Sequence, residues 1–286
     1  MDILGKRKIW YTISLTIIII GLLFTAFKGL NFGIDFNGGT LLEFKFDSMV
    51  TNEEARTALS KIDFAQDAVI QQSEEGGING ILIRIKQLTP KQIVDIEEAL
   101  IAEYPSTETL RTDIVGPVIG QELRIKALWS LLLASIAIII YISIRFEFRF
   151  AIVAIITLLH DILITVGLFA ILGGEINTPF VAALLTIIGY SINDTIVIFD
   201  RIRENMKLMQ RTPFIELANK AVVDTLPRSI NTSLTTLITI LAIYFFGGAS
   251  IKPFMLALFI GMFAGTYSSI FVASPLLVTW KKKFTS

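Results

Sequence analysis

Gly189-Tyr190-Ser191-Ile192-Asn193-Asp194-Thr195-Ile196-Val197-Ile198-Phe199-Asp200-Arg201 is the stretch that decides how this chain folds. It belongs to a largely apolar run, residues 179–199, which is long enough to cross a bilayer at roughly 20 residues per span. Because a helix rises about 1.5 Å per residue, Asp194 lies roughly 10 Å inside the basic end of this run. An aspartate that faced lipid at that depth would cost at least about 2.5 kcal/mol. We therefore expect a membrane helix whose Asp194 faces protein or trapped water and has a functional role.

The composition also indicates a membrane protein, because 53% of the 286 residues are hydrophobic. The chain has no cysteine, which excludes disulfides, thiolate catalysis and cysteine-ligated metals. The single histidine, His160, excludes a multi-histidine metal site within the chain. We expect no cofactor, no bound metal and no enzymatic activity.

The net charge is zero, but the charges are unevenly distributed. Residues 30–126 hold 16 acidic and 9 basic residues, a balance of −7, and the rest of the chain carries the opposite balance. An acidic block beside basic membrane-flanking loops is typical of a membrane topology and not of a nucleic-acid-binding surface. We therefore expect no nucleic-acid partner.

Six apolar runs predict a polytopic membrane protein with six transmembrane helices. The first, residues 9–27, is longer than the core of a signal peptide and no Ala-x-Ala-like site follows it, so we expect it to be retained. The other five form a second membrane segment, residues 127–280, with spans at 127–144, 150–172, 179–199, 230–246 and 254–280.

Basic residues gather on one side of these spans. They flank the amino terminus, the turn at 145–149, the segment 201–228 and the carboxyl terminus, whereas the opposite turns hold essentially Lys28 and Lys252. Because cytoplasmic loops carry the excess of Lys and Arg, both termini are predicted to be cytoplasmic. The amphipathic pattern at 214–222 predicts a helix that lies along the membrane surface.

Residues 30–126 predict an extracytoplasmic α+β domain between the first two spans. Four runs favour β-strands: 40–46, 68–72, 80–86 and 108–115. Helices are expected at 51–61, which opens with the capping-box pair Thr51 and Glu54, and at 89–103. A turn is expected at Glu75-Gly76-Gly77. The resulting order, β-α-β-β-α-β, is that of the ferredoxin-like fold.

The start and end of this domain have their own signals. Phe32-Gly33-Ile34-Asp35-Phe36-Asn37-Gly38-Gly39-Thr40 holds three glycines, Gly33, Gly38 and Gly39, which suit a tight reversal of the chain. Asp35 is expected to be a turn or cap residue. Residues 116–120 are expected to form a short connector to the second span.

Several polar residues lie within the predicted spans besides Asp194. Arg228 enters the bilayer on the side where the fourth span ends, which makes it the best candidate counter-ion of Asp194. One helix face carries Arg228, Thr232, Thr235 and Thr239, and it either packs against neighbours or holds a chain of waters.

The third and sixth spans also carry polar or small residues. His160 and Asp161, midway along the third span, indicate either interhelical hydrogen bonds or a role in proton movement. Adjacent helix residues point about 100° apart, so we do not expect both to face one partner equally. Gly261 and Gly265 form a small-xxx-small pair that predicts close helix packing.

Three motifs, at residues 32–39, 189–205 and 228–233, resemble the SecF members of the SecD/SecF family of bacterial protein-export subunits, which are similar to the resistance-nodulation-division transporters. The resemblance covers essentially the whole chain. It implies an accessory subunit of the Sec preprotein translocase in the bacterial cytoplasmic membrane, which uses the proton motive force to promote late steps of export. The implied partners are SecD, the SecY/SecE/SecG translocon and unfolded preprotein at the external domain.

The resemblance also implies roles for individual residues. Asp194 and Arg228 correspond to the proton-relay residues of the family. The other intramembrane or interfacial polar residues that we expect to support them are Asn193, Asp200, His160, Asp161 and Thr232. The family signature at the start of the external domain falls on Gly33, Asp35, Gly38 and Gly39.

Other functions are compatible with parts of the pattern. A half-transporter that exports a small molecule or lipid would need a ligand-sized apolar pocket in the external domain. A passive scaffold of the translocon would not need Asp194. An intramembrane aspartyl protease would need two facing aspartates such as Asp161 and Asp194, but no glycine-preceded protease motif is present. Carboxylates serve H⁺ or Na⁺, so the sequence leaves the driving ion open.

Overall fold

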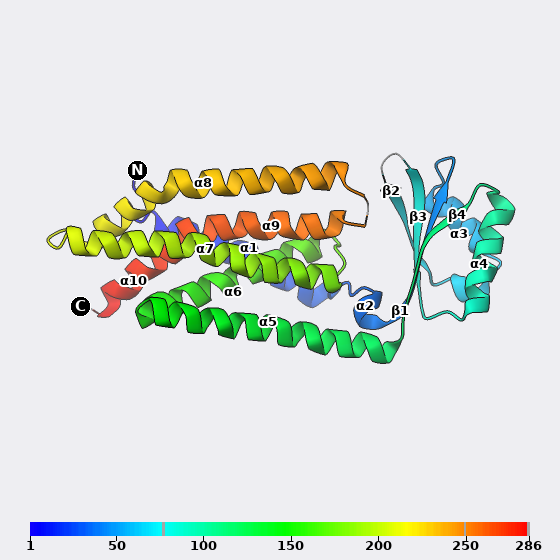
Figure 1. Ribbon diagram of the computed structural model, residues 1–286, viewed down its shortest axis with the longest axis horizontal. Coiled ribbons are helices and arrows are strands. Elements are labelled where there is room, and N and C mark those ends of the chain that lie inside the picture. The colour runs from blue at the N-terminus through cyan, green and yellow to red at the C-terminus, as the bar shows by residue number, and fades with distance from the viewer. Residues whose placement is uncertain (76–77, 249, 285–286) are drawn as a thin grey trace.

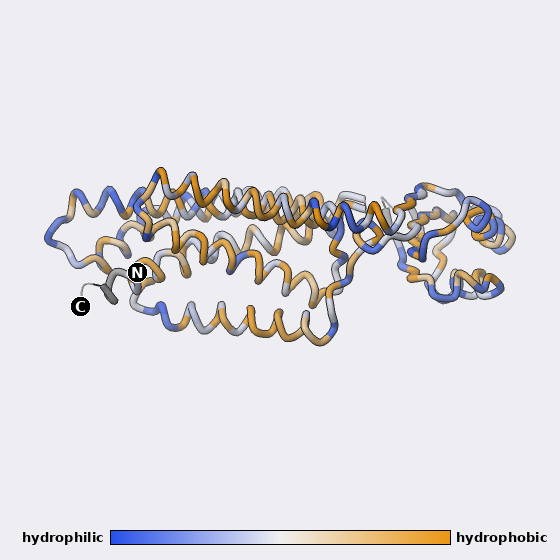
Figure 2. Tube along the Cα trace, turned by 90° about the horizontal axis from the view of Figure 1, so that it is seen from below, coloured by the Kyte–Doolittle hydropathy of each residue, from blue (hydrophilic) through white to orange (hydrophobic). Residues whose placement is uncertain are grey.

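The computed structural model describes residues 1–75, 78–248 and 250–284, and it separates into a helical membrane half and a smaller α+β domain (Figure 1). Within the described residues, six helices are long and apolar enough to span a membrane, as predicted. Five are single helices, α1 (Arg7–Lys28), α5 (Pro117–Arg145), α6 (Phe148–Ile171), α7 (Thr178–Leu208) and α8 (Phe214–Phe246). The hydrophobic residues follow these helices along most of their length (Figure 2).

The sixth span, Lys252–Trp280, is interrupted by a π-helical turn. It is built from α9 (Lys252–Ser268), the π-turn (Ser269–Ala273) and α10 (Ser274–Phe284). Such a turn carries one extra residue and changes which side chains face inward after it, and it is frequent at functional sites. The pattern of apolar residues at 254–280 does not predict this irregularity.

The predicted surface helix at 214–222 is instead the first part of α8. Pro227 lies inside this helix, which bends between its first turns and its membrane-length part (Figure 1). The apolar face of the first part, with Leu217, Ala218 and Ala221, is buried in the core of the membrane half. The amphipathic pattern therefore reports packing against protein, and the prediction of a helix lying on the membrane was wrong.

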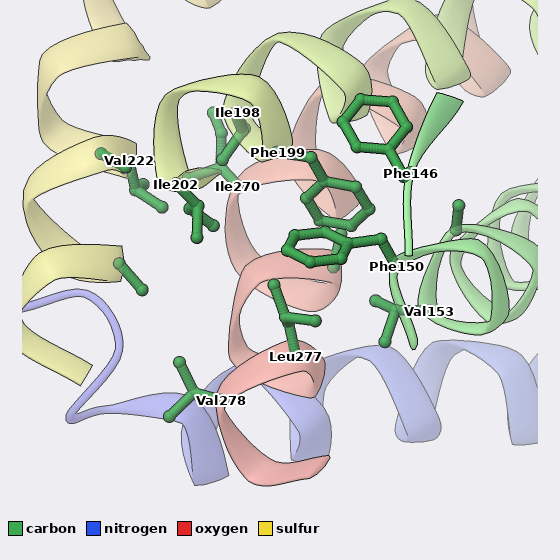
Figure 3. Close-up of a cluster of buried hydrophobic side chains, with 14 of the residues drawn as sticks. Phe146, Phe150, Val153, Ile198, Phe199, Ile202, Val222, Ile270, Leu277 and Val278 are labelled. Atoms are coloured by element: carbon green, nitrogen blue, oxygen red, sulfur yellow. The ribbon is translucent and has the colours of Figure 1, made fainter. Parts of the chain in front are cut away.

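Both chain ends lie at the end of the helices that is far from the α+β domain (Figure 1). An apolar cluster fills the bundle at that end, where Phe150 packs edge-on against Phe199 with ring centroids 5.0 Å apart (Figure 3). Phe146 completes the aromatic group, with its ring 6.2 Å from that of Phe199. The amino-terminal Ile3 and Leu4 are fully buried in the same cluster.

Helices cross closely at glycines. A Cβ atom at Gly167 of α6 would lie 2.9 Å from the Cα atom of Gly21 in α1. On α9, a Cβ atom at Gly265 would lie 2.9 Å from the Cβ atom of Ser191, and one at Gly261 would overlap Ile187. The predicted role of Gly261 and Gly265 in helix packing is confirmed, and their partner is α7.

The α+β domain holds an antiparallel sheet of strand order β2-β3-β1-β4. Its elements are β1 (Gly39–Phe46), α3 (Asn52–Leu59), a 3-10 turn (Asp63–Ala65), β2 (Val69–Glu75), β3 (Ile78–Ile85), α4 (Pro90–Glu103) and β4 (Glu108–Val115). Both helices begin with capping boxes, at Thr51 and Thr89. They cover one face of the sheet, and the other face looks toward the membrane half (Figure 1). The turn expected at Gly76-Gly77 lies outside the described residues.

The chain passes between the two halves through tightly packed glycines. After the short helix α2 (Ile34–Asn37), Gly38 and Gly39 have φ values of 75° and 141°, which only glycine adopts readily. A Cβ atom at Gly39 would lie 2.6 Å from the carbonyl oxygen of Ile85, and one at Gly120 would lie 3.0 Å from Gly38 N. Residues 117–120 are the first turn of α5 and not a flexible connector, because Pro117 starts the helix.

We expect Gly167→Val to destabilise the membrane half by about 1–3 kcal/mol, because the added side chain meets the backbone of α1. The matched control is Gly189→Val on α7, where an added Cβ meets nothing within 4 Å. Thermal unfolding of the purified variants in detergent measures the difference. Equal unfolding temperatures for the two variants would contradict the assigned α1–α6 contact.

Candidate functional site

Asp194 lies in the middle of α7 and is buried, with 4% of its surface exposed. Tyr190, one turn earlier, donates a hydrogen bond of 3.2 Å to Ser233 of α8. Because α7 and α8 run in opposite directions, this contact places Ser229, one turn before Ser233, opposite Asp194. The Ser229 hydroxyl acts on the Asp194 carboxyl from this position, but the buried atoms Asp194 Oδ2 and Ser229 Oγ do not reach hydrogen-bond geometry with each other or with another group in the described part of the chain. The expectation that Asp194 avoids lipid is met, but its carboxyl group is incompletely satisfied.

Arg228 does not form the ion pair with Asp194 that the sequence suggested. Its side chain is exposed on α8, and no ion pair joins it to any acid among the described residues. The buried stripe of α8 continues with helical spacing through Thr225, Ser229 and Ser233, and Arg228 lies off this stripe and is exposed. The guanidinium charge still acts on the Asp194 carboxyl from that position.

A polar and small-residue face is left uncovered where α7 and α8 meet the outside of the bundle. The exposed polar and small residues that form this face are Ala182, Thr186, Gly189, Asn193, Asn231, Thr232, Thr235 and Thr239. Beside them, α8 also exposes the apolar Ile230, Leu234 and Ile238. Thr235 and Thr239 direct their hydroxyls back to the carbonyls of Asn231 and Thr235 of their own helix. We call this surface the α7–α8 face. The sequence grouped Thr232, Thr235 and Thr239 correctly but did not show that they are exposed.

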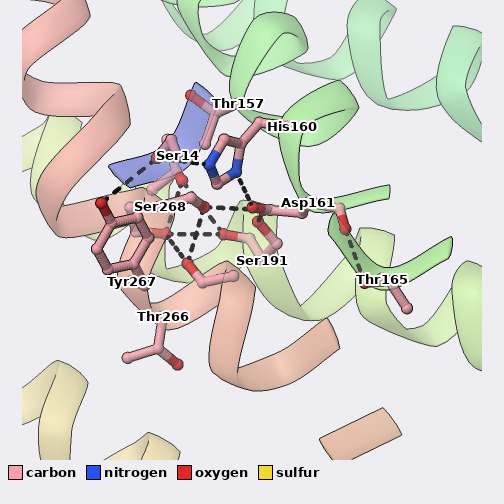
Figure 4. A network of polar contacts seen from close by, with 12 residues as sticks. Ser14, Thr157, His160, Asp161, Thr165, Ser191, Thr266, Tyr267 and Ser268 are labelled. Carbon is pink, nitrogen blue, oxygen red and sulfur yellow. Dashed lines mark hydrogen bonds and ion pairs between the residues drawn. The ribbon is translucent and has the colours of Figure 1, made fainter. Parts of the chain in front are cut away.

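His160 and Asp161 form a hydrogen-bonded pair at the centre of the bundle (Figure 4). His160 Nδ1 lies 2.8 Å from Asp161 Oδ1, and both side chains are buried. Asp161 Oδ2 accepts hydrogen bonds of 2.5 Å from Ser191 of α7 and 2.8 Å from Ser268 of α9. The two residues thus bond each other while reaching toward different helices.

The histidine connects this group to the first span. His160 Nε2 lies 2.9 Å from Ser14 Oγ on α1 (Figure 4). Next to Ser268, the π-turn residue Ser269 bonds Thr195 of α7 at 2.9 Å. The sequence analysis missed Ser14, Ser191 and Ser268. Their only signal is a hydroxyl in an apolar run, and the register between helices decides which hydroxyls meet an acid.

The interfacial acid Asp200 is not part of either group. It pairs with Arg145 at 3.3 Å near the end of α5, with both side chains more than 40% exposed. One residue further along, Arg201 pairs with Asp224 of α8 at 2.7 Å. Contacts of this kind join helix ends in a solvated region and contribute about 0–1 kcal/mol each.

Asp35 and Gly33 lie where the α+β domain meets the membrane half. Asp35 Oδ2 accepts a hydrogen bond of 2.8 Å from Thr178 N, so it caps the start of α7 and not a turn of its own segment. Gly33 N donates to Ile176 O at 2.9 Å, and a Cβ at Gly33 would overlap the Glu175 carboxyl. Two of the predicted signature residues therefore anchor the loop between α6 and α7.

A salt bridge of 2.6 Å between Arg84 of β3 and Glu175 of the α6–α7 loop ties the sheet to the membrane half. Glu175 is 11% exposed, and burial raises the pKa of its carboxyl above the ordinary 4.5. The Arg84 charge opposes this shift, and the Asp35 charge adds to it. A cavity of about 490 Å³ lies beside this salt bridge, between the open face of the sheet and the ends of α7 and α9. Its charged lining residues are Arg84, Arg111, Lys252, Asp35, Asp113 and Glu175.

The raised pKa of Glu175 predicts how docking of the domain depends on pH. A state in which Glu175 is exposed has the ordinary pKa, so the docked state binds a proton more tightly. Docking is therefore favoured as the pH falls through the raised pKa toward 4.5, and is weakened as the pH rises through it. Distances between spin labels at Lys91→Cys and Leu172→Cys measure this in a chain without other cysteines.

Glu175→Gln should remove that pH dependence, because the amide does not titrate. Glu108→Gln is the matched control, since Glu108 pairs with Lys45 within the domain and is 66% exposed. An unchanged pH dependence in Glu175→Gln would contradict the assignment.

Comparison with known proteins identifies relatives along the whole chain. Residues 95–283 match the model of the C-terminal region of the SecD/SecF protein export membrane proteins, and residues 23–48 match the SecD/SecF GG motif. The protein translocase subunit SecF of Thermobaculum terrenum is 42% identical over 99% of this chain and 95% of its own. The SecDF subunit of Thermus thermophilus is 40% identical over 95% of this chain and 37% of its own.

Two solved structures have the same fold. The crystal structure of SecDF from Thermus thermophilus, titled a translocon-associated membrane protein, superposes with a TM-score of 0.91 at 38% identity. It is matched over 99% of this chain and 39% of the SecDF chain. A structure of SecDF in a super-membrane-facing form superposes over 100% of this chain with a TM-score of 0.74. The chain thus spans about two fifths of these SecDF chains.

Proposed function

This chain belongs to the SecD/SecF family of protein export membrane proteins, and we propose that it acts with SecD as an accessory subunit of the Sec translocase that uses the proton motive force to promote late steps of export. The single observation that carries the energetic part of the proposal is the buried Asp194 carboxyl, which has an unpartnered oxygen at membrane depth. A group in this condition gains from a proton or from a new partner, so its state is sensitive to both.

Asp194 and Arg228 are the proposed relay residues. In the described state they do not form an ion pair, so a change in the α7–α8 contact would decide whether they meet. Protonation of Asp194 removes its attraction for Arg228, and this loss biases the helices toward one of two packings. One charge that crosses 100 mV supplies about 2.3 kcal/mol. This energy shifts a two-state equilibrium more than tenfold.

The α7–α8 face is the proposed contact surface for SecD. Without a partner it would expose amide and hydroxyl groups and small residues to lipid, where helices normally present large apolar side chains. Asn193, Thr232 and Arg228 lie on this face or at its edge. The matched SecDF chains are more than twice as long as this one, which leaves room in them for a second half. Of the other supporting residues, His160 and Asp161 are buried inside the helical bundle, and Asp200 pairs with Arg145 near the end of α5.

We further propose a bacterial cytoplasmic membrane location with both termini in the cytoplasm. The support is that the termini share one end of the bundle and that basic residues gather there. The domain at the other end would be an extracytoplasmic ferredoxin-like domain, since its strand order and its β-α-β-β-α-β sequence fit that fold. There it would meet unfolded preprotein as it leaves the SecY/SecE/SecG translocon. No step of this role requires enzymatic activity.

Asp194→Asn should reduce the proton-dependent part of preprotein export at least tenfold, because an amide neither binds nor releases the proton. Export into membrane vesicles with and without a proton gradient measures it. The matched control is Asp224→Asn, which weakens a partly exposed pair with Arg201 and should change export less than about twofold. Undiminished gradient-dependent export in Asp194→Asn would remove this residue from the mechanism.

Gly189→Leu should prevent stable association with SecD while the chain itself stays folded, because an added side chain at this position meets only open space within the chain. Co-purification of SecD from membranes measures the association, and we expect at least a tenfold loss. Leu23→Phe enlarges an exposed side chain on α1 and serves as the control. Retention of SecD by Gly189→Leu would place the contact surface elsewhere.

A further inference from the structure

The relay proposed above does not use the His160–Asp161 pair, although Asp161 is buried even more deeply than Asp194, which is 4% exposed. The side chains of His160 and Asp161 are 6% and 1% exposed, and His160 is the only histidine of the sequence. Four helices contribute to the hydrogen-bonded group around it: α1, α6, α7 and α9. The positions of its protons follow from which atoms can donate.

The Asp161 side of the pair has a fixed arrangement. Its Oδ2 accepts from the hydroxyls of Ser191 and Ser268, and its Oδ1 lies 2.8 Å from His160 Nδ1. With the carboxyl ionised, both of its oxygens can only accept, and in that arrangement His160 Nδ1 carries a proton and donates it to Asp161. The remaining question is whether Nε2 also carries one.

On the His160 side of the pair, the series of hydrogen-bonding groups ends at a backbone carbonyl. Tyr267 of α9 donates its hydroxyl proton to Trp10 O at 3.1 Å, so the Tyr267 oxygen can only accept from other groups. Ser14 Oγ lies between Tyr267 and His160, 3.3 Å from the Tyr267 oxygen and 2.9 Å from His160 Nε2. Ser14 has one proton and two neighbours that can accept it.

Two complete arrangements follow. When Nε2 has no proton, Ser14 donates to Nε2 and the Tyr267 oxygen receives nothing from it. When Nε2 carries a proton, it donates to Ser14, and Ser14 donates onward to Tyr267. The change needs rotation of one hydroxyl and no movement of a heavy atom. The protonated arrangement holds one hydrogen bond more, and its imidazolium faces the Asp161 carboxylate.

We propose that the His160–Asp161 pair is a second proton-binding site of this chain, separate from Asp194, and that uptake of a proton at His160 Nε2 adds a hydrogen bond from Ser14 to Tyr267 to the existing bond between α1 and α9. The proton comes from water and no covalent bond of the protein changes. The consequence is mechanical: α1 leads into the α+β domain, and the bound proton adds a hydrogen bond between α1 and the core of the bundle. The proposal does not depend on the export role.

Other titratable groups near the pair are few. Tyr267 stacks on the imidazole with ring centroids 6.2 Å apart and belongs to the hydrogen-bonded group. Asp194 lies on α7 three residues after Ser191, where it faces Ser229 of α8. The remaining titratable residues of the helices that pack around α6 are Arg7, Lys8, Tyr11 and Lys28 of α1, Glu122, Arg124, Lys126, Tyr141 and Arg145 of α5, Tyr190, Asp200, Arg201, Arg203, Glu204 and Lys207 of α7, and Lys252 of α9, and α6 itself adds Arg149. None of them is hydrogen-bonded to the side chains of His160 and Asp161, whose partners outside the pair are Ser14, Ser191 and Ser268. In α10, no titratable residue precedes Lys281.

The single histidine makes the proposal directly testable. The full chain, with ¹⁵N-labelled histidine and a tag free of histidine, is reconstituted in phosphatidylethanolamine–phosphatidylglycerol vesicles. Nitrogen NMR spectra are then recorded from about pH 9 to about pH 5, the range in which histidines titrate. The expected result is one protonated ring nitrogen at high pH and two at low pH. A ring with the same protonation state across the whole range would overturn the proposal.

Two variants separate a proton site from a structural contact. Asp161→Asn should leave one protonated nitrogen across the range, because the amide offers no charge to the imidazolium; a full titration in that variant would also overturn the pairing. The protection factors of the α1 amides, which compare the observed hydrogen-exchange rate with the intrinsic rate at the same pH, should rise on acidification in the unmodified chain and not in Ser14→Ala. Ser130→Ala is the control, since Ser130 bonds only the Lys126 carbonyl of its own helix. An equal rise of the protection factors in Ser14→Ala would exclude the link through α1.

Discussion

Polar groups inside a bilayer have no water to bond with, and this constraint organises the membrane half. The chain meets it in three different ways. Asp161 is fully satisfied by His160, Ser191 and Ser268. Asp194 is buried with one oxygen unpartnered, and the α7–α8 face is left exposed. The hydrogen bonds of Asp161 join helices of this chain to one another, whereas Asp194 Oδ2 and the α7–α8 face have polar groups without a protein partner in the described residues. These are the places where the proposed function puts the moving proton and the second protein.

The sequence predicted the elements better than the contacts between them. Six spans, four strands and two capped helices follow from local periodicity, which each segment expresses by itself. Asp194 could be identified because one charged residue in an apolar run is visible without any neighbour. The partner of Asp194 could not be identified, because the sequence does not show which face of α8 packs inward: Ser229 lies on that face and Arg228 does not. The amphipathic segment at 214–222 was misjudged for a related reason: a buried face and a lipid-facing face have the same pattern.

The serine network depends on the registers of four helices, and no single segment specifies it. Gly265 lets α9 approach α7 closely enough for Ser191 and Ser268 to reach the same carboxyl oxygen. Gly21 and Gly167 bring α1 and α6 together in the same manner, which places Ser14 beside His160. The π-turn that follows Ser268 then directs Ser269 toward Thr195. The small-xxx-small motif was therefore a correct sign of packing whose consequence for the polar groups appears only in the assembled bundle.

The segments that connect the two halves are short and tightly packed, and this determines how a change in the helical bundle affects the α+β domain. Only Gly116 separates β4 from α5, and α2 is held by Asp35 on Thr178 and by the Phe32–Ile176 bridge. Gly38 packs against the first turn of α5. A shift of α1 relative to α6 and α7 is therefore not absorbed by a flexible linker. Such a shift of α1 changes the angle at which the sheet meets the helices. The Arg84–Glu175 salt bridge is the contact that must hold or break when this angle changes.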